Sequence, residues 1–237
     1  MNGCGALHET TMSPAIAAQR PVCPACLRPR NACICRWVTP VVHPVQVLIL
    51  QHPLETHHPK GSARLLHLSL PGSQLVTGEK FADLPGLLTD TLSFQDRAAG
   101  PRHSVLLYPE TPQEMMQKVA RHSAAPELPP PDCGRDPARL RLVVLDGTWR
   151  KSRKILHCNP LLLQLPRLSL MDMPASRYLI RRARCTDHLS TLEATCAALA
   201  QLHGGRTQFA PLLASFDGFV AQQMEYRTHR RTAIIER

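Results

Sequence analysis

The most constraining feature of this sequence is the apolar run 142–145, which leads directly into Asp146-Gly147-Thr148-Trp149. The run lacks the alternation of a half-exposed strand, so it predicts a strand buried on both faces, as in a parallel α/β sheet. Asp146 then lies at the carboxyl end of that strand. Ligands bind at this edge of open α/β sheets, in the crevice outside the strand ends. The stretch therefore predicts an α/β fold with a candidate site at Asp146.

The residues after this strand fit two interpretations. In a binding turn, Gly147 allows close approach to a ligand and Trp149 offers a large flat surface. In a purely structural turn, Thr148 caps the following helix and Trp149 is buried. The local pattern is compatible with both.

Two further apolar segments have the same character. Residues 45–50 predict a buried strand that ends in polar Gln51 and His52, and residues 104–108 predict one that stops at Pro109. Short helices are expected at 64–68 and at 112–122. Because strands and helices alternate, we expect a mostly parallel sheet with helices on both faces.

The length of 237 residues suffices for one sizeable α/β core and a small appendage. We expect a disordered segment at 1–19, a zinc-binding knuckle at 20–40 and one α/β domain at 41–237. The proline-rich segment 123–139 is interpreted as a surface excursion within that domain.

The charge balance indicates a polyanionic partner. The chain has 28 Lys and Arg against 18 Asp and Glu, a formal charge of +10, which favours nucleic acid. No stretch approaches the roughly 18 apolar residues of a membrane-spanning helix, and residues 1–19 lack the pattern of a signal peptide. We therefore expect a cytoplasmic protein.

A cluster of cysteines predicts a metal site. Four of the nine cysteines fall within thirteen residues: Cys23, Cys26, Cys33 and Cys35. Four thiolates match the tetrahedral all-sulfur set that Zn²⁺ prefers and leave no open position, so the ion is expected to be structural. A redox pair is the alternative, but it leaves Cys33 and Cys35 unexplained.

Two basic segments are candidates for RNA contacts. Arg150 and Lys151 begin the helix that follows Trp149. A basic helix of this kind is compatible with contacts to phosphates and equally with exposure to solvent. Further along, arginines surround an aromatic residue and form a second candidate strip: Arg177, Tyr178, Arg181 and Arg182. Arginine binds phosphate in two-point contacts and stacks on bases.

Ser190 and Glu193 form a capping box, which predicts a helix that runs through Leu202. Its amino-terminal amides can hold a carboxylate or a ribose hydroxyl, although capping alone explains the pattern almost equally well. A last helix is expected from Phe209 to about Tyr226.

Six motifs in sequence resemble the DTW-domain family, which is named for an Asp-x-Thr-Trp signature. They are Cys23-x-x-Cys26-x-Arg28-Pro29 with Cys33-x-Cys35, Gln51-His52-Pro53, Leu107-Tyr108-Pro109, Asp146-Gly147-Thr148-Trp149, Arg177-Tyr178 and Leu189-Ser190-Thr191-Leu192-Glu193-Ala194. The match runs from Cys23 to about Leu202. The proline-rich segment departs from the family, and residues 61–64 match it only loosely.

The resemblance implies an activity and an architecture. The family resembles tRNA-uridine aminocarboxypropyltransferases, which move the 3-amino-3-carboxypropyl group of S-adenosylmethionine to a uridine ring nitrogen and release methylthioadenosine. It is also similar to the SPOUT class of RNA-modifying enzymes, which implies a SPOUT-like catalytic domain over 41–237 with a carboxyl-terminal trefoil knot.

The resemblance also implies roles for residues. The uridine nitrogen must lose its proton to attack, so Asp146 is expected to be the general base, with Thr148 and Trp149 beside it in the catalytic site. Cofactor contacts are expected from the remaining motifs: Leu107, Tyr108, Pro109, Asp146, Gly147, Leu189, Ser190, Thr191 and Glu193. Trp149 can pack on the adenine, the methionine chain or the target base.

Two alternatives remain at this point. A SPOUT-type site that presents the methyl carbon would be an RNA methyltransferase with nearly the same residues. A zinc-containing RNA-binding protein without catalysis is the other. The transferase explains the motifs, the charge and the cysteines together.

Overall fold

The structure, a computed structural model, describes residues 21–89, 102–109, 136–171, 176, 189–203 and 205–235. Within them, five strands form one sheet in the order β2-β1-β4-β3-β5, and every neighbouring pair is parallel. The strands are β1 (Gln46–Gln51), β2 (Gln74–Thr77), β3 (His103–Leu107), β4 (Leu140–Asp146) and β5 (Arg167–Leu168). The α/β class and the parallel sheet are confirmed.

The three strands predicted from apolar runs, β1, β3 and β4, lie together at the centre of the sheet. Strand β4 begins two residues before the run 142–145 and includes the fully buried Arg141, whose Nε donates to Gln46 Oε1 on β1. This partner lets a guanidinium occupy a buried strand position.

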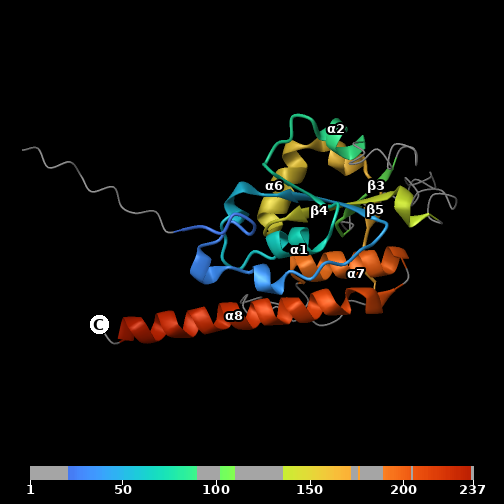
Figure 1. Cartoon of the computed structure of the whole chain (residues 1–237). Coiled ribbons are helices and arrows are strands. Elements are labelled where there is room, and N and C mark those ends of the chain that lie inside the picture. The colour runs from blue at the N-terminus through green and yellow to red at the C-terminus, as the bar shows by residue number, and fades with distance from the viewer. Residues whose placement is uncertain are drawn as a thin grey trace, which may run out of the picture.

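Helices cover both faces of the sheet (Figure 1). One face carries α1 (Ala63–Ser69), α7 (Thr191–His203) and α8 (Ala210–Ile235), and the other carries α2 (Leu84–Thr89) and α6 (Trp149–Cys158). Alternate strand residues divide between the two cores: Ile49 and Leu142 face α1 and α7, whereas Leu50 and Val143 face α2 and α6. Both faces therefore bury apolar side chains, which explains the unbroken apolar runs.

Short 3₁₀ helices connect these elements. They are η1 (Arg30–Ala32), η2 (Cys35–Trp37), η3 (Pro53–Glu55), η4 (Pro137–Arg139), η5 (Pro160–Gln164) and η6 (Arg206–Phe209). The helices expected near 64–68, from Ser190 and after Phe209 are present as α1, α7 and α8.

Some expectations concern segments that lie outside the described residues: the disordered segment 1–19, the helix at 112–122 and most of the proline-rich segment 123–139. Much of the segment between β5 and α7, residues 172–175 and 177–188, also lies outside them. Among the described helices, none has the length and apolar character needed to cross a membrane.

The cysteine-rich segment is packed onto the α/β domain. Cys26 and Ile34 belong to the same buried cluster as the residues between the sheet and α8. Trp37 Nε1 donates to Gln222 Oε1 on α8, and Gly218 lies so close to the Trp37 ring that a Cβ there would overlap it. Glycine at 218 thus permits close packing of η2 against α8.

Strands β1 and β4 create the position for a binding site. After β1 the chain continues to β2 at one edge of the sheet, whereas after β4 it continues to β5 at the opposite edge. A parallel sheet has a crevice where successive connections diverge in this way. The last residues of the two strands, Gln51 and Asp146, are register partners at this point.

Candidate functional site

Asp146 is the centre of the candidate site. Its side chain is buried, and each carboxylate oxygen accepts a hydrogen bond from a different element. Gln51 Nε2 at the end of β1 donates to Oδ2 over 2.9 Å, and Thr191 Oγ1 at the start of α7 donates to Oδ1 over 2.6 Å. The carboxylate is therefore fixed in orientation by groups 95 and 45 residues away in the chain.

A pocket opens beside this carboxylate. It is lined by three short segments: Glu55 with His58, Lys60, Gly61 and Ser62; Asp146 with Gly147; and Ser190 with Thr191. The lining contains two carboxylates, a lysine and several hydroxyls. Such a set suits a small ligand that carries both positive and negative groups.

Gly147 makes room for the pocket turn. A Cβ at this position would lie 3.0 Å from Cβ of Lys151 and 3.7 Å from Cβ of His52. The first contact is shorter than ordinary van der Waals packing, so a larger residue would displace the first turn of α6.

An ion pair fixes the wall of the pocket formed by η3. Glu55 is buried, and Lys151 Nζ on α6 approaches its Oε1 to 2.8 Å. Next to it, the buried His52 pairs through Nε2 with Glu79 Oε1 at 2.8 Å. The backbone N–H of His52 donates to the carbonyl of Asp146 over 3.0 Å. The His52 amide thus holds the end of β1 against the end of β4, and the pair with Glu79 joins it to the residues that follow β2.

The predicted capping box is present at the start of α7. The backbone N–H of Ser190 donates to Glu193 Oε2 over 2.8 Å, and the N–H of Glu193 donates to Ser190 Oγ over 3.2 Å. Between them, the backbone N–H of Leu192 donates to Ser62 Oγ over 3.3 Å. These side chains occupy amides of the first turn and join α7 to the pocket loop at Ser62.

Thr148 caps α6, because its Oγ1 accepts from the N–H of Lys151 over 3.4 Å. The side chain of Trp149 is 49% exposed and not buried, so the structural interpretation of this turn is wrong for Trp149. The Trp149 and Tyr108 rings meet edge to face, with 5.5 Å between their centroids. The guanidinium of Arg167 lies over the Tyr108 ring, 5.4 Å from its centroid. An exposed aromatic surface thus stands next to the Asp146 turn.

The structure brings together only some of the predicted site residues. Asp146, Gly147, Ser190 and Thr191 line one pocket, and Glu193 lies behind Ser190 in the capping box. Leu107 ends β3 beside β4, and Tyr108 and Pro109 follow it. These three residues, like Leu189, Thr148 and Trp149, are not part of the described pocket lining. Four proposed RNA contacts lie outside the described residues: Arg177, Tyr178, Arg181 and Arg182.

Sequence reasoning missed the contribution of residues 55–62. The sequence marks Gln51 only as a polar strand end, because its hydrogen bond to Asp146 follows from strand register, which the sequence does not display. Glu55, Lys60 and Ser62 enter the pocket from a loop without periodicity. Their one available signal was their place after a strand of the central sheet.

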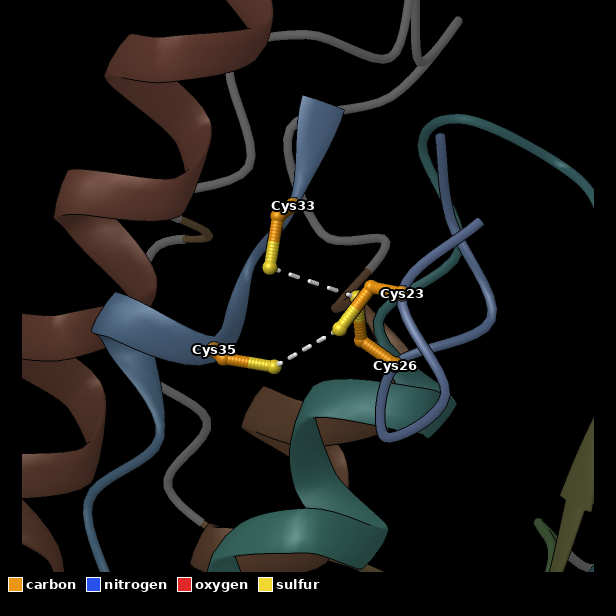
Figure 2. Close-up of side chains that lie close together, drawn as sticks. All are labelled: Cys23, Cys26, Cys33 and Cys35. Carbon is orange, nitrogen blue, oxygen red and sulfur yellow. Dashed lines mark hydrogen bonds between the residues drawn. The ribbon is translucent and has the colours of Figure 1, made fainter. Parts of the chain in front are cut away.

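The four cysteines predicted to bind zinc converge in space. All four Sγ atoms lie within 4.8 Å of one another, and they come from two turns of the chain (Figure 2). Cys23 Sγ and Cys35 Sγ are 3.6 Å apart, and Cys26 Sγ and Cys33 Sγ are 3.7 Å apart. Sulfurs at Zn–S distances of about 2.3 Å in a tetrahedron are about 3.8 Å apart, so this donor set fits Zn²⁺.

The thiols in this cluster differ in acidity. Hydrogen bonds from the backbone at Cys26 and Ala25 lower the pKa of Cys23 to about 6, whereas burial raises the pKa of Cys35 to about 12. A divalent cation binds thiolates and displaces their protons. Cys23 is thus mostly ionised at neutral pH and ready to bind a cation, whereas Cys35 must first lose its proton.

Comparison with known proteins identifies related sequences. The family model described as DTW domain matches residues 20–224. No solved structure matches the chain.

Three curated relatives are named as tRNA-uridine aminocarboxypropyltransferases. The chain is 31% identical over 197 residues to tRNA-uridine aminocarboxypropyltransferase 2 of Drosophila melanogaster, covering 78% of this chain and 67% of that protein. It is 26% identical over 226 residues to the protein of that name from Macaca fascicularis, covering 93% and 68%. It is 24% identical over 149 residues to tRNA-uridine aminocarboxypropyltransferase A of Arabidopsis thaliana, covering 62% and 54%.

Proposed function

This chain belongs to the DTW-domain family, and we propose that it is an enzyme, a tRNA-uridine aminocarboxypropyltransferase that uses S-adenosylmethionine as co-substrate. The product would be 3-(3-amino-3-carboxypropyl)uridine in tRNA, with methylthioadenosine as the second product. The observation that carries the proposal is the buried Asp146, held by Gln51 and Thr191 at the edge of a pocket lined by groups of both charges.

Asp146 is assigned the role of general base. The uridine nitrogen gives its proton to this carboxylate and attacks the carbon next to the sulfonium; the new N–C bond forms as the C–S bond breaks. Gln51 and Thr191 donate to the two carboxylate oxygens from fixed directions, and Asp146 lines the pocket in this orientation. Orientation of the two substrates supplies much of the rate enhancement.

The pocket is assigned to the co-substrate. Lys60 can attract the carboxylate of the transferred group, whereas Glu55 and Asp146 favour its ammonium and sulfonium charges. Gly147, Ser190 and Thr191 line the same pocket, and Glu193 and Leu189 support the turn that presents them. Leu107 ends the neighbouring strand β3 and is followed by Tyr108 and Pro109, and we assign these three residues to a more distant part of the co-substrate.

The tRNA is assigned to the surface next to this pocket. Trp149 stands half-exposed outside the described pocket lining, which favours the target base over the adenine as its stacking partner. Arg150 and Lys151 follow it on α6 and are assigned to phosphates, Lys151 also pairing with Glu55. The strip Arg177, Tyr178, Arg181 and Arg182 is assigned to RNA on its sequence alone.

Three further assignments complete the proposal. The cysteine cluster holds a structural Zn²⁺, because its four sulfurs would fill all four positions of a tetrahedral coordination. The domain is SPOUT-like with a carboxyl-terminal trefoil knot, as the family resemblance implies. Its place is the cytoplasm, where its tRNA substrate is found.

A double-label assay tests the proposed reaction. Unmodified bulk tRNA is offered S-adenosylmethionine labelled in the carboxyl carbon in one reaction and in the methyl group in another. Carboxyl label in the RNA is the expected result, and the Asp146→Asn protein serves as the control for background transfer. Methyl label would show a methyltransferase instead, and no label in either reaction would favour RNA binding without catalysis.

A further inference from the structure

The cysteine turn fixes the position of the residue that follows it. The N–H of Leu27 donates to the carbonyl of Cys23 over 2.9 Å, and the N–H of Cys23 donates to the carbonyl of Arg28 over 2.8 Å. Leu27 adopts φ 58°, in the left-handed region, within this turn. The same turn that brings Cys23 and Cys26 together therefore sets the backbone of Arg28.

Arg28 reaches from this turn to the loop that forms one wall of the pocket. Its Nη1 donates to the carbonyl of Pro59 over 2.7 Å and its Nη2 to the carbonyl of Gly61 over 3.0 Å. The guanidinium also lies over the ring of Phe219 on α8, 5.2 Å from the ring centroid. A planar fork with donors on two nitrogens is well suited to hold two carbonyls at once.

The loop that Arg28 holds is part of the site. Gly61 and Ser62 line the pocket, and the Gly61 N–H donates to the carbonyl of His58 over 2.9 Å. Ser62 Oγ accepts from the N–H of Leu192, next to the residue that hydrogen-bonds Asp146. A shift of this loop would change the pocket wall and the start of α7 together.

A second contact runs in the opposite direction. Arg64, in the first turn of α1 directly after the pocket loop, donates through Nε and Nη2 to the carbonyl of Ala25. Ala25 lies between Cys23 and Cys26. Two arginines thus link the metal-binding turn and the pocket loop, one from each side.

We propose that Arg28 is a positioning residue that couples the cysteine cluster to the pocket, so that bound metal and bound S-adenosylmethionine stabilise each other. The inference rests on the proposed function, which assigns S-adenosylmethionine to the pocket and Zn²⁺ to the cysteines. A metal holds the cysteine turn in one shape, Arg28 transmits that shape to Pro59 and Gly61, and the co-substrate finds its wall already formed. Such coupling is reciprocal, since each ligand must raise the affinity of the other by the same factor.

Zinc release provides a test that requires no catalysis. The zinc-loaded protein is mixed with a chromogenic chelator, with and without saturating S-adenosylmethionine and in the absence of tRNA. In the natural chain we expect the co-substrate to lower the fraction of zinc lost at equilibrium, by about tenfold in the apparent zinc dissociation constant, within the usual range for coupled sites. The affinity for S-adenosylmethionine is measured on the same samples by calorimetry.

Arg28→Ala should weaken this effect severalfold, leaving only the link through Arg64, while still binding zinc in a 1:1 ratio, and should raise the Kd for S-adenosylmethionine severalfold. In steady-state assays the change should appear in KM for S-adenosylmethionine more than in kcat. Arg28→Lys keeps the charge but loses the fork, so it should resemble Arg28→Ala. Arg30→Ala removes an exposed arginine from the same segment and should behave like the natural chain.

The outcomes separate the two proposals. Failure of the natural chain to bind S-adenosylmethionine would overturn the proposed function and this inference with it. Normal binding with zinc release unchanged by the co-substrate, or a coupling that is undiminished in Arg28→Ala, would overturn only the role of Arg28. Should Arg28→Ala fail to fold, the zinc-release comparison on the natural chain and on Arg28→Lys still decides.

Discussion

Thr191 donates its side-chain hydroxyl to Asp146 Oδ1 over 2.6 Å and so joins the first residue of α7 to the last residue of β4. Gln51 meets the other oxygen from β1. Three elements thus orient one carboxylate, and each of them also contributes to the core of the domain. The orientation of the proposed base is a property of the packed fold, and removal of either donor should change catalysis without dissolving the structure.

Asp146→Asn should retain the fold and tRNA binding but lose transfer. Asparagine keeps the shape and still accepts one hydrogen bond, but it cannot take the proton of uridine, so we expect kcat to fall by about 10² to 10⁴. Single-turnover assays with carboxyl-labelled S-adenosylmethionine measure the loss, and filter binding measures the tRNA affinity. Unchanged turnover would remove Asp146 as the base.

Thr191→Val should lower kcat by about fivefold, because the carboxylate loses an orienting hydrogen bond with a net value of about 1 kcal/mol. Thr191→Ser keeps the hydroxyl and is the matched control, with activity close to the natural chain. Circular dichroism checks that α7 is intact in both proteins. Equal activity of the valine and serine variants would show that this hydrogen bond does not contribute to catalysis.

The central strands could be predicted because both faces of the sheet are covered. Burial on both sides requires unbroken apolar runs, and β1, β3 and β4 carry them. Strand β2 is only half-buried and β5 has two residues, so neither leaves such a run in the sequence. Their existence depends on tertiary pairing with β1 and β3.

The residues of the candidate site likewise fall into those with a local sequence signal and those without one. Asp146 was predictable from its place after a buried strand, and the Ser190 and Glu193 capping box from its spacing. Gln51 and the loop to Ser62 were not, because their roles arise from strand register and from a loop held by Arg28. Contacts between distant parts of the chain leave no local pattern.

Trp149→Ala should weaken the interaction with tRNA and leave the affinity for S-adenosylmethionine unchanged. The ring is half-exposed beside Tyr108, and stacking of one base on an aromatic side chain contributes about 1 to 3 kcal/mol. We therefore expect KM for tRNA to rise about tenfold or more, with Trp149→Phe keeping most of the affinity. A variant that instead loses affinity for S-adenosylmethionine would place Trp149 in the co-substrate pocket.

Cys26→Ser should destabilise the whole domain, because the cysteine segment shares its hydrophobic core with α8. Loss of a structural zinc removes folding free energy, so we expect the melting temperature to fall by more than about 5 °C. Chelation of zinc from the natural chain should reproduce this shift. Cys158→Ser changes a half-buried cysteine outside the cluster and should leave the melting temperature nearly unchanged. A metal-free natural chain of full stability would contradict a structural role for zinc.

Zinc affinity should fall as the pH falls, because protons and the metal compete for the same sulfur atoms. In the metal-free protein the pKa of Cys23 is lowered to about 6, so this sulfur is mostly ionised at pH 7, whereas the pKa of Cys35 is raised to about 12 and its thiol keeps its proton. Zinc binding at pH 7 should therefore release protons, but fewer than four. Calorimetric titration in two buffers of different ionisation enthalpy counts them, with Arg30→Ala as a control that leaves every sulfur in place. Release of a full four protons would show that Cys23 is not ionised beforehand, and release of none would show that the metal does not bind these thiols.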